Sequence, residues 1–507
     1  MNSQLLQHLY WRAGFGPRPE DIAAGLRPAK ALRQLLHDAE SYTPIESPAF
    51  HYADPLGAVM AVQPTAPVPA ATAMAADLPL LSPRSAALPP GRLAAPVLRR
   101  RDLTPEQRKQ QNEGIRDAFA AMSTAWMERM ATDPGQLREK MALFWHGHFA
   151  CRTRRPDDSL QLLNTIRQHA LGTFPDLLLA VSRKPAMLQF LNNQQNKKEH
   201  PNENFAREVM ELFTLGRGNY SEVDVQEAAR AFTGWSYDGQ NNFVFRERQH
   251  DAGPKTFLGH TGNLGGEDVL AIIMQQPAAA TFLVTKLYRF FVNDVPNPAH
   301  IEPLAAAFRR SHYDIADLAE RLFSAPWFYD AANVGVRIKS PVELIAGLRR
   351  TLGVQVDNAL PLLGYQKALG QTLFMPPNVA GWPGGRSWID SSSLLLRLQL
   401  PAILFKNAEF AVRLKDDEND ITPQTTSKER TVRNTVGAHL PLAALQHLGG
   451  TRAAEQPQQL ASRLLQVPIR PENLALVQQA AAKAATPEEQ LRATLIGLLS
   501  LPEYQLS

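Results

Sequence analysis

The chain has 507 residues, 44% of them hydrophobic, which suffices for two or three domains or for one large helical body with an appendage. Its 53 Lys and Arg residues only slightly outnumber its 49 Asp and Glu residues, and the single basic run, Arg99–Arg101, closes a linker, so nucleic-acid binding is not predicted. Cys151 is the only cysteine, which excludes an intrachain disulfide and a thiolate metal cage.

The N-terminal region predicts two short amphipathic helices within residues 3–40, separated by a GFGP turn and by Arg27-Pro28. Its first residues, MNSQLLQHLYWRAGFGP, show neither a charged segment followed by an apolar core nor a twin-arginine pair, so no export signal is predicted. No stretch approaches the roughly 18 uninterrupted apolar residues of a membrane span. We therefore expect a cytoplasmic protein without a membrane span, or a periplasmic one if it is exported with a partner.

Composition divides the chain into five parts and favours a mainly α fold. A Pro/Ala-rich stretch is typical of a low-complexity, disordered insert or linker, and the run KDDENDITPQTTSKER is typical of a surface loop. The predicted parts are an N-terminal helical segment packing on the main body (1–42), the insert (43–101), a helical core with a polar site (102–410), a charged loop (411–430) and a C-terminal helical segment (431–507). We expect a large multi-helix bundle or array with at most a small β-hairpin near 237–250.

Two histidines follow each other closely where an early helix of the core ends. A long helix begins at Thr104 and stops at Asp133, and the next helix ends in FWHGHF, which contains His146 and His148. Residues two apart share a face only on an extended chain, a conformation that Gly147 permits. The two imidazoles are therefore candidates to chelate a divalent metal ion, or else ordinary partners of carboxylates.

The densest run of ionisable groups lies in a helix that begins after Pro201. Its apolar residues form two adjoining stripes at helical spacing, so most of this helix is expected to be buried. The remaining stripe carries Asn204, Arg207, Glu208 and Glu211. Carboxylates with perturbed pKa values gather at catalytic sites, but a salt-bridge network that fixes helix packing would use the same residues.

A second helix and a later loop extend this polar cluster. The second helix is predicted to begin after Ser221 with a capping box, and it carries Arg230 beside Glu227 on one face. The loop contains His250, Asp251 and Lys255. His250 is a candidate third metal ligand and Asp251 a candidate to orient an imidazole. The alternative is that Asp251 caps a turn and His250 is an exposed loop residue.

Ser340 and Pro341 predict the cap and the first residue of a further helix. Lys339 just before it, with Arg349 or Arg350 near its end, are candidates to reach an anionic group.

The run NENFAREVMELFTLGRGNYSEVDVQEAARAFTGW resembles the signature of the DUF1800 family, a bacterial family named for its unknown function. The same order of motifs continues the resemblance, from about residue 5 to about residue 400, in HLYWRAGFGP, FWHGHF, HDAGPKTFLG, IKSPVEL and PPNVAGWPGGRSWID. Members often occur beside exported, sulfatase/alkaline-phosphatase-like proteins of the DUF1501 family, so the resemblance implies a DUF1501-like partner. It implies no settled activity.

The residue types favour a hydrolase, metal-dependent or not, with a buried Glu/Arg/His site for a polysaccharide or a phosphate or sulfate ester. A carboxylate- and His-bridged redox site is less favoured because Glu208-x-x-Glu211 lacks the histidine. The alternatives are a non-enzymatic helical scaffold and an assembly or export partner of a DUF1501-like protein. The candidates are catalytic Glu208, Glu211, Arg207 and Asp251, substrate-binding Asn202, Asn204, Arg230, Trp235 and Lys255, and metal-binding His146, His148 and His250.

Overall fold

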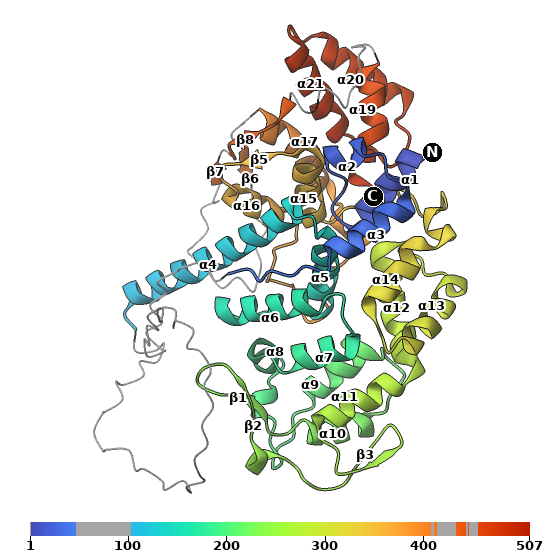
Figure 1. The fold of residues 1–507 in the computed structure, drawn as a ribbon. Helices are drawn as coiled ribbons and strands as arrows, with labels where there is room; N and C mark the ends of the chain where they lie inside the picture. The colour runs from blue at the N-terminus through green and yellow to red at the C-terminus, as the bar shows by residue number, and fades with distance from the viewer. Residues whose placement is uncertain are drawn as a thin grey trace, which may run out of the picture. The chain divides into compact units, whose positions relative to one another are not determined.

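The computed structural model describes residues 2–46, 103–406, 410–412, 432–434, 436–442, 445 and 455–507, and helices dominate them (Figure 1). Two compact units can be distinguished, one of Met1–Pro48 with Ala118–Ser507 and one of Ala49–Asp117. The fold that follows is that of the first unit. The predicted insert (43–101) and charged loop (411–430) lie outside the described residues, apart from residues 43–46 and 411–412.

Helices of the first half of the chain include several that start with proline, whose missing N–H is not needed in the first turn. They are α1 (Asn2–Ala13), α2 (Pro19–Ala23), α3 (Pro28–Asp38), α4 (Pro105–Thr132), α5 (Gln136–His148), α6 (Pro156–His169), α7 (Phe174–Ser182), α8 (Pro185–Phe190), the 3₁₀ helix η2 (Asn193–Gln195), α9 (Asn204–Glu208), the π-helix η3 (Val209–Thr214) and α10 (Glu222–Ala231).

Helices of the second half likewise include several that start with proline. They are η4 (Glu247–Gln249), α11 (Gly266–Gln275), α12 (Pro277–Phe291), α13 (Pro298–Arg310), α14 (Ile315–Ser324), η5 (Pro326–Tyr329), α15 (Pro341–Leu352), α16 (Leu360–Ala368), η6 (Gly385–Trp388), α17 (Ser391–Phe405), α19 (Gln456–Leu464), α20 (Pro471–Ala482), α21 (Pro487–Leu499) and η8 (Pro502–Gln505). No single described helix has the length and apolar composition for a membrane crossing; α11 and α12 meet those criteria only as a pair bent by 78°.

Within the described ranges, strands occur only as short antiparallel pairs. They are β1 (Trp235–Tyr237) with β2 (Phe243–Phe245), β3 (Lys255–Phe257) with β4 (His260–Gly262), β5 (Gln355–Val356) with β8 (Ala438–His439), and β6 (Phe410–Val412) with β7 (Val432–Asn434). In the first hairpin Trp235 lies opposite Phe245. The mainly α fold is thereby confirmed, and three further two-stranded sheets join the one hairpin that the sequence predicted.

Helices α5 and α15 form the centre of the core. Every residue of α15 is buried, and in α5 only Gly147 is not. Helix α1 packs against both, and its Trp11 lies so close to Gly347 that a Cβ there would come within 2.4 Å of the Trp11 ring. The C-terminal helix α19 packs against α1 (Figure 1), where the Gln7 side-chain amide donates to the Ser462 carbonyl at 3.1 Å.

Candidate functional site

The helix with the predicted acids begins at an Asx turn and runs from α9 directly into η3. The Asn204 N–H donates to the side-chain oxygen of Asn202 at 3.0 Å, and the Asn204 amide donates to the Leu191 carbonyl at 3.1 Å. The buried side of the helix includes Phe205, Val209, Met210 and Phe213. The two asparagines predicted to bind substrate therefore fix the start of this helix.

The π-helix η3 leaves main-chain carbonyls that neighbouring helices satisfy. Lys286 of α12 donates through Nζ to the Leu212 carbonyl at 3.0 Å, and His148 of α5 donates through Nε2 to the Phe213 carbonyl at 3.0 Å. Thr214 bonds back to the Val209 carbonyl at 2.6 Å. Carbonyls at a helix end need such partners, and π-helical turns are frequent at functional sites.

Glu208 and Glu211 lie one turn apart on the outer side of this helix, in different surroundings. Glu211 accepts hydrogen bonds from Arg217 Nε at 2.6 Å and from the Tyr220 hydroxyl at 3.2 Å. Glu208 has no hydrogen-bond or ion-pair partner within the described part of the chain, and partial burial together with the charge of Glu211 raises its pKa. One carboxylate is thus bonded to protein partners, while the raised pKa of the other lets it take up a proton more readily.

Arg207 clamps the two helices of the signature together. Its two terminal nitrogens donate to the two carboxylate oxygens of Glu222, at 2.8 and 2.7 Å, and one also donates to Glu203 at 3.2 Å. These bonds, those to Glu222 first, raise the pKa of Arg207. The guanidinium therefore joins the start of α10 to the start of α9.

Arg230 and Asp251 fold the loop after the first hairpin against α10. Arg230 donates to Glu227 at 2.8 Å and to Asp251 at 2.7 Å, and the bond from Arg230 lowers the pKa of Asp251. The buried Lys255 ammonium donates to the carbonyls of Asp251 and Gly253, at 2.6 and 3.0 Å. The structure thus brings Arg230, Asp251 and Lys255 together, with each bonded to protein groups.

The three histidines predicted as metal ligands make separate contacts. His146 Nε2 accepts the Phe374 N–H at 3.1 Å, His148 Nε2 donates to the Phe213 carbonyl, and His250 Nδ1 lies 2.9 Å from the Thr233 carbonyl. Among the described residues no three His, Cys, Asp or Glu side chains form a group that could hold a metal ion, so the predicted set of His146, His148 and His250 is not formed. The reason is that α5 stays helical through Gly147, and residues two apart on a helix do not share a face.

Both histidines of α5 are held in the neutral form. Burial lowers the pKa of His146 to about 4. Burial, with the charge of Lys286, lowers the pKa of His148 well below its ordinary value. The donor and acceptor roles above fit neutral rings, since His146 must keep a lone pair on Nε2 and His148 must keep a proton there.

Trp235, a predicted substrate-binding residue, is buried at the start of β1. Its ring centroid lies 5.2 Å from that of Phe232 and 5.3 Å from that of Phe243, both nearly edge-on. This aromatic group joins the first hairpin to α10, so the tryptophan contributes packing.

The partners of Glu211 were not predicted from the sequence. Arg217 and Tyr220 reach it because the chain turns back after η3, with Gly216 at φ +75° and Gly218 at φ +85°. Such angles favour glycine. The two glycines in TLGRGNY are the local sequence signal for this turn. They do not indicate which side chains the turn brings into contact with Glu211.

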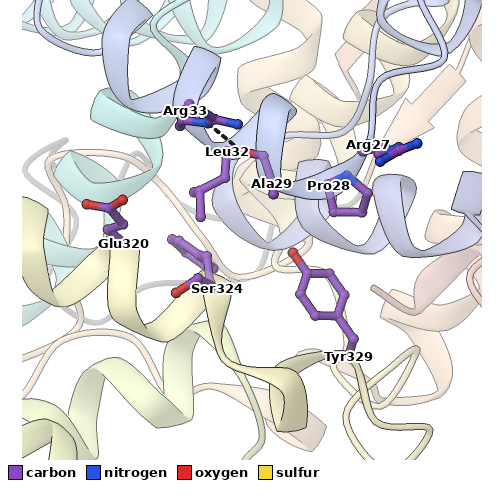
Figure 2. Close-up of a pocket in the computed structure, with 9 residues that line it drawn as sticks. Arg27, Pro28, Ala29, Leu32, Arg33, Glu320, Ser324 and Tyr329 are labelled. Atoms are coloured by element: carbon purple, nitrogen blue, oxygen red, sulfur yellow. Dashed lines mark hydrogen bonds between the residues drawn. The ribbon is translucent and has the colours of Figure 1, made fainter.

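A cavity of about 560 Å³ lies between α3 and α14 (Figure 2). Its lining consists of Arg27, Pro28, Ala29, Leu32, Arg33, Glu320, Phe323, Ser324 and Tyr329. Arg33 donates within its own helix to the Ala29 carbonyl at 3.4 Å (Figure 2). No predicted site residue lines this cavity.

Residues 8–506 match the family described as "Protein of unknown function (DUF1800)". No curated protein and no solved structure matches the chain. The match covers nearly all of the chain, including α9 with η3, α10, and the histidines of α5. The chain therefore belongs to the DUF1800 family.

Proposed function

We propose that the chain is a hydrolase of glycosidic bonds in polysaccharides, with Glu208 as the general acid and Glu211 as the general base. The observation that supports this most is the contrast between two carboxyl groups one turn apart. Glu211 is bonded to Arg217 and Tyr220, whereas the half-buried Glu208 has a raised pKa. Glycosidases separate their acid from their base through this kind of difference in environment.

In the proposed reaction Glu208 gives its proton to the glycosidic oxygen as the bond from that oxygen to the anomeric carbon breaks. Glu211 accepts a proton from the water whose oxygen forms the new bond to the anomeric carbon. Exchange with solvent then returns a proton to Glu208 and removes one from Glu211. Fixing the acid, the base and the sugar in one geometry supplies much of the rate enhancement.

A polysaccharide suits this surface better than a phosphate or sulfate ester. An ester of that kind needs free guanidinium or ammonium groups for its charged oxygens. Here Arg207 is bonded to Glu222 and Glu203, and Arg217 is bonded to Glu211. The two guanidinium groups nearest the acids are thus occupied by carboxylates.

The test compares wild type with Glu208→Gln and Glu211→Gln on a panel of polysaccharides, with release of reducing ends as the readout. Loss of an acid or a base is expected to lower the rate about 10²- to 10⁴-fold. The wild-type rate should fall as pH rises through the raised pKa of Glu208. Glu302→Gln, at an exposed carboxylate of α13 outside this polar cluster, is the control and should keep its activity. Equal rates for Glu208→Gln and wild type would contradict the proposal.

A non-enzymatic helical scaffold is the second candidate function. It is favoured by the saturation of Arg207, Arg230 and Lys255 with protein partners, since these contacts tie α9, α10 and the following loop together. Under this alternative Arg230→Met would lower the melting temperature, Glu208→Gln would leave it nearly unchanged because Glu208 bonds no described protein group, and no polysaccharide would be cleaved. Copurification of a DUF1501-like protein would extend the scaffold to the predicted assembly or export role.

A further inference from the structure

A second group of charged side chains lies in the interior, away from the residues used above. It joins α1, α5, α15, α17 and the segment before α15, and every member is at most 8% exposed. We refer to it as the cationic cluster, and its members are Arg12, Lys140, Arg337, Lys339, Arg397 and the single carboxylate Glu343.

The carboxylate of the cluster is already engaged. Glu343 accepts from Lys140 Nζ at 2.5 Å through one oxygen and from the Ser340 N–H at 2.7 Å through the other. Lys140 completes its bonds with the carbonyls of Trp11 and Gly14, at 3.2 and 2.8 Å. Lys140 and Glu343 therefore satisfy each other, and the remaining cations must find other partners.

Lys339 finds its partners in aromatic rings and a carbonyl. Its ammonium lies 3.7 Å from the centroid of Trp11 and 3.8 Å from that of Tyr504, and it donates to the Tyr504 carbonyl at 2.6 Å. Ring faces attract cations. Lys339 is therefore accounted for by the fold itself.

The guanidinium groups of the cluster are only partly accounted for in this way. Arg337 lies over the Phe290 ring, 5.2 Å from its centroid, and Arg397 donates through Nη1 to the Lys339 carbonyl at 2.9 Å. Arg12 donates through one nitrogen to the Asn333 carbonyl at 2.7 Å, but its Nε and Nη1 are buried without a hydrogen-bond partner in the described part of the chain. The same holds for Nε of Arg337 and for Nε and Nη2 of Arg397. Buried donors without acceptors are rare in folded proteins because each has lost its hydration.

We infer that the cationic cluster binds a small dianionic oxyanion, a phosphate or sulfate group either free or carried on an ester, with Arg12 and Arg337 as its main ligands. Planar guanidinium groups match the oxygens of such anions in pairs. Five cations lie within electrostatic reach of one buried carboxylate, Glu343, with the half-exposed Asp294 at the edge, so a dianion adds negative charge where cations are in excess. Burial and the neighbouring charge of Arg337 lower the pKa of Arg12 well below its ordinary value, and a bound anion would oppose both effects.

Asp294 marks the edge where an anion would enter. Its side chain is 48% exposed and lies 3.9 Å from Arg337 Nε, too far for a hydrogen bond. Gly385, at φ +60°, packs against Asp294, because a Cβ there would lie 2.6 Å from Oδ2. The Asp294 carboxylate lies on the side from which an oxyanion would approach Arg337. Asp294 and the anion would therefore compete for the Arg337 guanidinium.

Titration calorimetry on the full chain at constant ionic strength tests the inference, with inorganic phosphate, inorganic sulfate and glycerol 3-phosphate as probes and chloride as the blank. Wild type should bind phosphate or sulfate at one site, and its melting temperature should rise with their concentration. Arg12→Met and Arg337→Met should lose at least tenfold in affinity. If the protein binds inorganic phosphate or sulfate but not glycerol 3-phosphate, the ligand is the free oxyanion. If it also binds glycerol 3-phosphate, the site accepts the group carried on an ester.

Arg138→Met is the matched control. Arg138 is also a buried arginine, but its nitrogens donate to the carbonyls of Ala39, Glu40, Arg167 and Gln168, so its loss should leave anion affinity unchanged. If the cluster variants fail to fold, Asp294→Asn provides the test at a half-exposed position, and it should bind phosphate severalfold more tightly. No saturable binding to wild type, equal affinities in all arginine variants, or unchanged affinity in Asp294→Asn would overturn the inference. Cleavage of polysaccharides is assayed separately, so its absence would not change the conclusion about anion binding.

Discussion

At the scale of single residues, the neutral state of His146 follows from where α5 places it. The ring lies among Trp126, Phe374 and Trp382, with centroids 5.2 to 5.4 Å away, and only 4% of the residue is exposed. Its Nε2 accepts the Phe374 N–H. Protonation would place a charge in an apolar environment and remove that acceptor, which is why the pKa falls to about 4.

We therefore predict that His146 makes the protein less stable in acid. Between its ordinary value of 6.5 and about 4, the unfolded chain binds a proton that the folded chain does not, so stability falls as pH drops through this range. At about 1.4 kcal/mol per pKa unit, the loss is roughly 3 kcal/mol. The variant His146→Gln keeps a hydrogen-bond acceptor at this position but has no group that titrates in this range. Its free energy of unfolding, measured by urea denaturation, should therefore fall less than that of wild type between pH 7 and pH 4.5.

The decline should be reduced in this variant and not abolished. Burial also lowers the pKa values of His8 and His148, and both would still take up protons on unfolding. Parallel pH curves for the variant and wild type would contradict the role given to His146.

At the scale of elements, the helix with the acids could be predicted from its sequence but its π turn could not. The spacing of Phe205, Val209 and Met210 predicts the buried side, and Ser221 predicts a capping box that the structure confirms. The π turn depends on His148 and Lys286, which lie 65 and 74 residues from the carbonyls they meet. For the same reason the sequence left open an extended conformation at Gly147 of FWHGHF, because only the packing of α5 decides that the helix continues.

We predict that η3 is stabilised by the hydrogen bond from His148 to the Phe213 carbonyl. His148→Phe keeps the ring but leaves that carbonyl buried without a donor, which should cost about 1–3 kcal/mol of unfolding free energy. His148→Gln should cost less because its amide can still donate. Urea denaturation gives the energies, and hydrogen exchange should rise at residues 209–216 in the phenylalanine variant. A phenylalanine variant more stable than the glutamine variant would show that packing, and not the bond, governs η3.

At the scale of the whole first unit, segments that are far apart in sequence close the core together. The segment before α15 forms backbone hydrogen bonds with the last residues, from Arg337 to Ser507 at 3.2 Å and from Lys339 to Gln505 at 2.9 Å. The Trp11 and Tyr504 rings lie edge to face at 6.3 Å. Periodicity in the sequence predicted helices at both ends, but no local pattern indicates a contact such as that of Trp11 with Tyr504, which lie near opposite ends of the sequence. The cationic cluster was missed for the same reason, since Lys339 is the one member of the cluster that the sequence singled out as a candidate for an anion.

The dependence of both chain ends on Tyr504 gives a prediction at this scale. Tyr504 is fully buried, and its ring contacts Trp11 of α1 and the ammonium of Lys339. Tyr504→Ala should cost roughly 3–5 kcal/mol, the range for removing a buried aromatic side chain. Hydrogen exchange should increase in α1 as well as near residue 504, because both sides of the contact lose their partner. Leu476→Ala, at a position in α20 that is 63% exposed, should change stability little. Faster exchange confined to residues 502–507 would show that the two ends fold independently.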